Sequence, residues 1–292
     1  MKHAFLIITH NEPYILDVLL SKLQHPDNTC FVHIDKKVKG KELMHLSKIA
    51  NKWGGVICNT IDVRWGDYSQ IQCELELFEA TVNYPVTFDY YHLISGVDLP
   101  IQPMSYIHQF FEHHPGKLFF RLISDSANQK QIFDKTNYYY FFMFFSKTAF
   151  GKLLDIMHIP GLTIKIQKVI GVSRCKHDHI NLYKGDQWCS LPHDAVEYLL
   201  AHKNYIRKRF RFTNCPDEIY KQTVLMNSPF QSQVFQPETG TQNAALREID
   251  WKRGTPYVWR IEDKEFLTNS SNIFARKFSS QYKEIIDYIK EI

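Results

Sequence analysis

The sequence predicts an α/β fold in which helices flank a mostly parallel central sheet, in a single domain with a C-terminal appendage. Two observations support this prediction. Short apolar runs alternate with amphipathic segments through the first third of the chain, and neither an internal repeat nor a low-complexity linker divides the 292 residues. Strands that are separated by helices run parallel and need cover on both faces. A chain of this length can bury one large core.

The elements of the first third follow from the spacing of apolar residues. Residues 4–8 and 29–34 are short apolar runs of the buried-strand type, and an amphipathic helix that ends near Pro26 separates them. A helix at about 41–51 and a short strand at 56–58 come next. Asp67 or Ser69 then begins a helix with one apolar face, and a strand at 88–94 follows it.

The pattern is less regular from about 119 to 171 and contains a dense aromatic run at 138–145 (YYYFFMFF). This run predicts a buried segment or an interface patch, and a membrane-contact patch is the alternative. Helices are expected at about 192–202, from Pro216 onward, and as an amphipathic final segment at about 280–292. A loop rich in Gln, Pro and Thr at about 231–245 precedes the basic tail.

Composition narrows the function. The formal charge is +4, which is too small for a nucleic-acid-binding domain but fits one anionic ligand or loose contact with an acidic membrane surface. The six cysteines show no C-x-x-C pair, so free thiols in a reducing compartment are expected. The apolar run near the N-terminus, residues 4–8, is too short for a signal peptide. No apolar stretch of the sequence is long enough to span a membrane. We expect a cytoplasmic protein, with peripheral membrane contact as an option.

Two carboxylates follow Pro216, a residue preformed for the first position of a helix. Sugar transfer by single displacement needs a base that takes the proton of the attacking hydroxyl, and a pocket carboxylate is the usual choice. Glu218 is the candidate base, and Asp217 is expected to cap the helix. The alternative is that both are ordinary acids at a helix start, where they complement the helix dipole.

A departing nucleoside diphosphate needs positive charge, supplied by a metal or by fixed cations. The Asp-x-Asp triplet common in metal-dependent nucleotide-sugar enzymes is absent from this sequence. The basic C-terminal segment could supply the charge instead, and solvated surface cations are the alternative; its members are Arg253, Arg260, Arg276 and Lys277. His177 and His179 raise a metal hypothesis, but no third ligand stands at a recognisable spacing.

Several familiar enzyme classes are excluded by missing motifs. The sequence has no G-x-G-x-x-G, no G-x-x-x-x-G-K-[ST] and no G-x-S-x-G. Ligands of parallel sheets bind at the carboxyl ends of the strands, where Thr9, His10, Asp35 and Asp98 are expected. Two indoles stand beside small or polar neighbours and suit either the core or the stacking of a sugar; these are Trp65 and Trp188.

Six motifs occur along the chain in one order: His33-Ile34-Asp35-Lys36, Arg64-Trp65-Gly66-Asp67-Tyr68-Ser69, Ser95-Gly96-Val97-Asp98-Leu99-Pro100-Ile101, Lys184-Gly185-Asp186-Gln187-Trp188, Pro216-Asp217-Glu218, and Asp250-Trp251 through Phe274-Ala275-Arg276-Lys277-Phe278. Together they resemble the core-2/I-branching β-1,6-N-acetylglucosaminyltransferases and the related peptide O-xylosyltransferases of glycosyltransferase family 14. The resemblance spans nearly the whole chain.

This resemblance implies a GT-A type nucleotide-sugar-binding fold and a role for each matched residue. Glu218 would be the general base, and Lys277 would contact the diphosphate with the help of an arginine, either Arg253 or Arg260. Thr9, His10 and Asp35 would lie near the uridine. The substrate pocket would contain Trp65, Asp98, Asp186, Gln187 and Trp188. Residues of about 1–120 would form the nucleotide-sugar-binding half, and about 171–292 the acceptor-binding and catalytic half.

The resemblance also implies the reaction. A UDP-sugar, most readily UDP-N-acetylglucosamine, would donate its sugar with inversion and without a metal or other cofactor to a glycan or glycolipid acceptor. UDP-xylose or another UDP-hexose is the alternative donor, and a catalytically silent sugar-binding protein is the alternative from another class. Without the membrane anchor and luminal disulfides of the animal enzymes, the chain is similar to a bacterial-type member that acts in surface-polysaccharide or glycolipid assembly. No nucleic-acid partner is expected.

Overall fold

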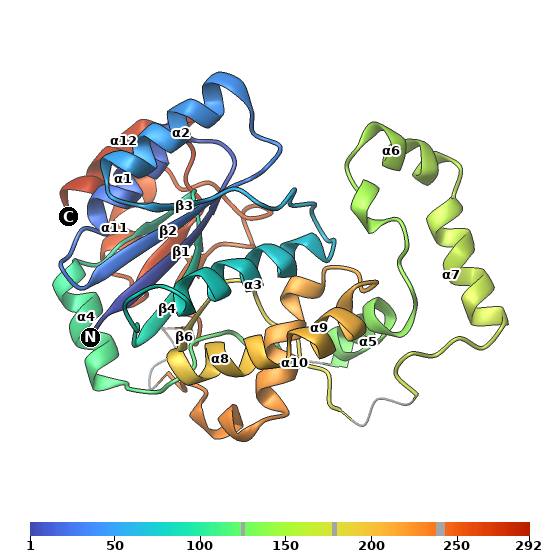
Figure 1. Cartoon of the computed structure of the whole chain (residues 1–292). Helices are drawn as coiled ribbons and strands as arrows, with labels where there is room; N and C mark the ends of the chain where they lie inside the picture. The colour runs from blue at the N-terminus through green and yellow to red at the C-terminus, as the bar shows by residue number, and fades with distance from the viewer. Residues whose placement is uncertain (124–125, 177–179, 238–242) are drawn as a thin grey trace.

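The computed structural model describes residues 1–123, 126–176, 180–237 and 243–292 (Figure 1). Its central sheet has five strands in the order β3-β2-β1-β4-β6, and a smaller sheet has three in the order β5-β8-β7. The strands of the central sheet are β1 (His3–Thr9), β2 (Asn28–Ile34), β3 (Val56–Cys58), β4 (Tyr90–Ser95) and β6 (Cys189–Pro192). Those of the smaller sheet are β5 (Asp98–Pro100), β7 (Arg247–Ile249) and β8 (Phe274–Arg276).

The helices alternate with these strands in the first third and dominate the middle of the chain. They are α1 (Pro13–Lys22), α2 (Gly40–Lys52), α3 (Ser69–Val82), α4 (Met104–His113), α5 (Ser126–Asn137), α6 (Ala149–Ile156), α7 (Ile159–Val169), α8 (His193–Ala201), α9 (Lys203–Phe210), α10 (Tyr220–Met226), α11 (Lys264–Thr268) and α12 (Lys283–Glu291). Short 3-10 helices stand at η1 (Met143–Phe145), η2 (Pro216–Glu218), η3 (Pro229–Gln233), η4 (Ile261–Asp263) and η5 (Ser280–Tyr282).

The central sheet is mostly parallel, as predicted. β1 pairs in parallel with β2 and β4, β2 pairs in parallel with β3, and only β6 runs antiparallel, beside β4. The α/β class is therefore confirmed. Because β6 comes from the second half of the chain, the two halves expected from the sequence share one sheet.

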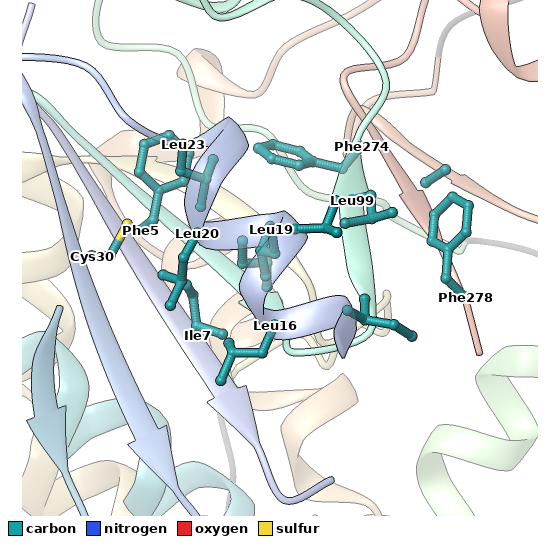
Figure 2. Packing of buried hydrophobic residues seen from close by; sticks show 14 of the residues in the cluster. Phe5, Ile7, Leu16, Leu19, Leu20, Leu23, Cys30, Leu99, Phe274 and Phe278 are labelled. Atoms are coloured by element: carbon teal, nitrogen blue, oxygen red, sulfur yellow. The ribbon is translucent and has the colours of Figure 1, made fainter. Parts of the chain in front are cut away.

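Side chains of β1 divide the core between the two faces of the sheet, as the two-residue period of a strand requires. Phe5 and Ile7 belong to a cluster with α1, α2, α12 and the smaller sheet, whereas Ala4 and Leu6 belong to one with α3, α8 and α10. Figure 2 shows the leucines of α1 packed between β1 on one side and Leu99 and Phe274 on the other. Burying each of these leucines contributes about 2 kcal/mol to the free energy of unfolding. This packing anchors the smaller sheet to the central one.

The structure changes two expectations for the second half. A helix does begin at Pro216, but η2 is a single 3-10 turn, and Ile219, at φ −126°, separates it from the α-helix α10. The aromatic run at 138–145 is not a buried segment, since each of its residues is exposed or half-exposed, and an interface patch or a membrane-contact patch stays a prediction. This run leads into α6 and α7, which project from the body of the molecule as a helical hairpin (Figure 1).

Candidate active site

The carboxyl ends of β1, β2 and β4 lie side by side and bring three sequence motifs together. The backbone N–H of Asp35 donates to the carbonyl of Thr9 at 2.9 Å, and that of Gly96 donates to Ile8 at 2.9 Å. A Cβ atom on Gly96 would lie 2.4 Å from the Thr9 hydroxyl oxygen, so only glycine allows this approach. The expected uridine-binding residues therefore do meet at one edge of the sheet.

Asp35 is buried at this edge and paired with a lysine. Its carboxylate accepts from the Lys37 backbone at 2.9 Å and from Lys37 Nζ at 2.8 Å, and the same ammonium group contacts Asp62 at 2.8 Å. A groove of about 570 Å³ opens beside this cluster, between Lys37, Asp62 and Phe144. His10, next to Thr9, is exposed.

Asp98 and Arg276 join the two sheets at the same edge. Their strands pair them in register, and Arg276 Nη1 donates to Asp98 Oδ1 at 2.8 Å and to the Ser95 hydroxyl. Asp98 is fully buried, and its other oxygen accepts from the Ser95 backbone at 2.8 Å. The guanidinium carbon of Arg276 lies 4.6 Å from the centroid of the Trp188 ring, within cation–π range. Arg276 thus connects the strand ends to the Lys184–Trp188 motif.

Gly185 connects that motif to the candidate base. Its N–H donates to the carbonyl of Glu218 at 2.8 Å. A Cβ atom at this position would lie 1.8 Å from the carbonyl oxygen of Arg121, so any other residue would force the motif away from the segment that contains Arg121. The backbone contact fixes Lys184 and Asp186 beside η2, and the close approach to Arg121 explains why glycine stands between them.

The Glu218 carboxylate is partly open to solvent and faces two ammonium groups. Its side chain is 35% exposed, and Lys135 Nζ and Lys184 Nζ each lie 3.5 Å from Oε2. Asp186 lies nearby, and its burial raises the pKa of that carboxyl against the opposing influence of Arg121 at 3.9 Å. A carboxylate that is oriented by cations and still accessible is suited to accept a proton from a bound hydroxyl.

Asp217 points the other way, into the protein. Only one of its oxygens has a hydrogen-bond partner, the Gln70 amide at 3.2 Å, and Oδ1 is buried without one. Burial, reinforced by the charges of Glu218 and Glu74, raises the pKa of Asp217 to about 7. Asp217 therefore does not cap a helix as expected, because its side chain belongs to a buried network behind the site.

The cations expected to bind the diphosphate differ in whether they already form ion pairs with carboxylates. Arg253 contacts Asp250 at 2.5 Å and Asp263 at 2.7 Å. Within the described residues, neither Lys277 nor Arg260 has a carboxylate within 4.0 Å. The two are neighbours in space, because the N–H of Trp259 donates to the carbonyl of Lys277 at 3.1 Å. The exposed Arg260 guanidinium lies over the ring of Tyr282, 4.7 Å from its centroid.

Two expected pocket residues take part in other contacts. The Gln187 amide donates to the buried Glu74 at 3.0 Å, so it supports the site from behind. Trp65 is 55% exposed, and its ring carries Lys147 Nζ at 4.1 Å from the centroid. Trp188, by contrast, is 8% exposed and packs against Arg276 at the centre of the arrangement.

Sequence reasoning missed three of the cations in this site, Lys135, Arg121 and Lys184. Lys135 lies 83 residues from Glu218 in sequence, on α5, and no motif surrounds it. Arg121 stands in an irregular segment before the projecting hairpin and pairs with Asp186. Lys184 could have been found, because it begins the motif that Gly185 places against Glu218.

In the part of the chain that the structure describes, no three His, Cys, Asp or Glu side chains gather as the ligands of a metal would. His177 and His179, which raised the metal hypothesis, lie outside the described residues. Of the described helices, none combines the length and the apolar character that crossing a bilayer requires.

A family model described as "Branch: Core-2/I-Branching enzyme" matches residues 3–269. The chain belongs to the Core-2/I-branching enzyme family. It is accordingly a glycosyltransferase that uses a nucleotide sugar, as the order of its motifs predicted. The matched segment contains Glu218 and Arg260 and ends before Arg276 and Lys277.

Solved structures similar to this chain are distant in sequence. The apo form of mouse xyloside xylosyltransferase 1 has 9% identity and a TM-score of 0.41, covering 94% of this chain and 96% of that one. A 4-diphosphocytidyl-2C-methyl-D-erythritol synthase from Anaerococcus prevotii has 11% identity and a TM-score of 0.34, covering 77% and 84%. No curated protein matches this chain.

Proposed function

We propose that this member of the family transfers N-acetylglucosamine from its UDP donor, with inversion, to an acceptor sugar hydroxyl through a β-1,6 linkage. The acceptor hydroxyl attacks the anomeric carbon, the bond from that carbon to the diphosphate oxygen breaks, and Glu218 takes the hydroxyl proton. UDP leaves with the electron pair of the broken bond. The observation that supports this best is the accessible Glu218 carboxylate between Lys135 and Lys184. A surface polysaccharide or glycolipid precursor on the cytoplasmic side would provide the acceptor.

The leaving diphosphate, in this proposal, is neutralised by Lys277 and Arg260 without a metal. Both cations lack a carboxylate partner among the described residues, whereas Arg253 is held between Asp250 and Asp263. A free cation can form charge-assisted hydrogen bonds to a phosphate at lower cost than one that must first break two ion pairs. Turnover should therefore persist in EDTA, and a rate that vanishes on chelation would contradict this part of the proposal.

Glu218→Gln tests the base. Removing a general base lowers the rate by about 10²–10⁴-fold, whereas binding of UDP should not change, since the carboxylate acts on the acceptor. Transfer from UDP-N-acetylglucosamine, UDP-xylose, UDP-glucose and UDP-galactose is measured together with UDP affinity by calorimetry. Glu79→Gln is the matched control, because Glu79 also pairs with a lysine, at 2.9 Å, on the surface away from the site. Full turnover in Glu218→Gln would exclude this role.

Lys277→Ala and Arg260→Ala test the donor site. Each loss of a charged hydrogen bond should weaken UDP-sugar affinity by about 10- to 100-fold, corresponding to 1.5–3 kcal/mol. Arg253→Ala is the comparison, with UDP affinity near that of the unmodified protein and a lower melting temperature. If Arg253→Ala lost the affinity and Arg260→Ala did not, the assignment of the two arginines would be reversed.

A further inference from the structure

Residues 138–176 form a projecting arm whose outer surface is apolar. The arm contains η1, α6 and α7 and extends away from the two sheets (Figure 1). Of 19 large apolar side chains that are exposed in the described part of the chain, 11 belong to this arm. Scattered apolar residues are normal on a protein surface, but such a concentration marks an interaction surface.

Both helices of the arm turn an apolar stripe toward solvent. On α6 the stripe contains Phe150 and Leu153, which are 52% and 50% exposed, and it continues to Met157 at 59%. On α7 it contains Leu162, Ile166 and Val169, at 55%, 49% and 86%. These spacings of three and four residues place each set on one helix face. A surface helix of a soluble domain normally turns such a stripe inward, so these two faces lack their partner.

The inner faces of the same helices are already occupied, and on α7 the buried Gln167 hydrogen-bonds with both backbone groups of Tyr139 in the aromatic run. Gly151 and Leu154 of α6 are buried, and a Cβ atom on Gly151 would lie 2.0 Å from the carbonyl oxygen of Phe145. The hairpin therefore packs closely against the aromatic run with one face and leaves the other free. Rotating the helices to bury the outer stripes would break this contact.

The charge of the arm indicates what covers the outer faces. The arm carries six basic residues and one acidic residue, a formal charge of +5, whereas the whole chain carries +4 and the remainder −1. Three of the lysines, Lys152, Lys165 and Lys168, are exposed on the two helices beside the stripes. Long cationic side chains next to exposed apolar residues suit an interface of acyl chains and anionic headgroups. A second copy of the chain would instead bring two surfaces of +5 together.

The geometry points to a role for the arm as a docking surface for an anionic lipid bilayer: we propose that α6 and α7 lie in the headgroup region with their apolar stripes inserted. The base of the arm lies next to the candidate active site. The N–H of Tyr140 donates at 2.9 Å to the carbonyl of Phe212, in the segment just before η2, and the N–H of Arg174 donates at 3.1 Å to the carbonyl of Asn137, on the same helix as Lys135. Docking would hold Glu218 near the membrane surface, which favours a lipid-linked acceptor; only this last step depends on the proposed function.

Co-sedimentation with vesicles tests the docking surface. Vesicles of phosphatidylcholine alone are compared with vesicles that also contain phosphatidylglycerol. The unmodified protein should bind the anionic vesicles and lose this binding in high salt, because salt screens the attraction of lysines to headgroups. Leu153→Asp/Val169→Asp should bind them at least about tenfold more weakly, since it places charge in both apolar stripes.

The matched control is Met44→Asp/Phe266→Asp, which alters two apolar residues that are 64% and 56% exposed but lie outside the arm. It should bind vesicles as the unmodified protein does. Lys152→Glu/Lys168→Glu should abolish the preference for phosphatidylglycerol. Equal vesicle binding by the arm variant and the control would overturn the proposal. So would a dimer in sedimentation velocity that only the arm variant loses, because a second copy would then be the partner.

Hydrolysis of the UDP-sugar in water separates this proposal from the previous one. The arm variants should hydrolyse the donor at the unmodified rate, because none of the altered residues contacts the site. An arm variant that loses vesicle binding and keeps this activity supports docking whatever the acceptor is. Loss of both in a folded variant would contradict an independent docking surface.

Discussion

Two lysine–glutamate clusters lie on either side of η2 and differ most in their access to water. Glu74 and Lys221 form an ion pair in which both side chains are 0% exposed. Glu218, with Lys135 and Lys184, is 35% exposed at its carboxylate, and the ammonium groups lie 3.5 Å away. The same chemical groups are structural in one place and available for reaction in the other. Burial, and not residue type, separates the two roles.

We call the buried pair of Glu74 and Lys221 the sealed cluster, and the accessible group of Glu218, Lys135 and Lys184 the open cluster. The sealed cluster has no hydrogen-bonding capacity left for a ligand. Both oxygens of Glu74 are used, one by the Gln187 amide at 3.0 Å and the other by the Tyr220 hydroxyl at 2.6 Å together with Lys221. The lysine reaches back to the carbonyl of Asp217 at 3.4 Å. These contacts fix η2 from behind, so that the backbone of Glu218 is held while its side chain stays accessible. The buried pair supports the geometry of the open one.

Breaking the sealed pair should produce the largest effect. Lys221→Met leaves the Glu74 charge buried and uncompensated, which costs about 3–5 kcal/mol of folding free energy. Urea denaturation at neutral pH measures this directly. The double variant Glu74→Gln/Lys221→Met should recover most of the loss, because a neutral amide can still contact Tyr220 and Gln187. A single variant as stable as the unmodified protein would show that the pair is not sealed.

Asp217 connects the two clusters and should make their stability depend on pH. Its folded pKa of about 7 lies above the ordinary value of 3.8, so the folded state retains a proton that the unfolded chain has released. Stability is therefore lost as pH rises from about 4 to about 7 and is then constant. Asp217→Asn removes this penalty, which is at most about 4 kcal/mol because one pKa unit corresponds to about 1.4 kcal/mol.

The measurement is the difference in unfolding free energy between Asp217→Asn and the unmodified protein across this pH range. The difference should be near zero at pH 4, grow in favour of the variant, and level off above pH 7. Asp194→Asn, at an exposed position on α8, is the control and should show no such trend. A flat difference for Asp217→Asn would mean that Gln70, Lys221 and their neighbours stabilise the charged carboxylate.

The sequence predicted one residue of the open cluster, Glu218, and neither residue of the sealed one, and the reason is physical. A proline before two acids is a local pattern, so Glu218 could be singled out from its neighbours in the chain. Lys221 meets Glu74 only through the packing of α10 on α3, 147 residues apart in sequence. The same limit applies to Lys135. The outward apolar stripes of the arm escaped prediction because spacing defines a helix face without saying which way it points.

The open cluster should show the smallest change in stability and a specific change in rate. Lys184→Met and Lys135→Met each remove one partly exposed ion-pair partner, which costs at most about 1 kcal/mol of folding free energy. Turnover should fall further than stability, because the carboxylate loses one of the two groups that orient it. In the Glu218→Gln background, Lys184→Met should lower the remaining rate no further, because the effects of substituting two residues that act together are not additive. An equal loss in both backgrounds would mean that Lys184 acts on the substrate directly, and the two clusters would then differ in more than their access to water.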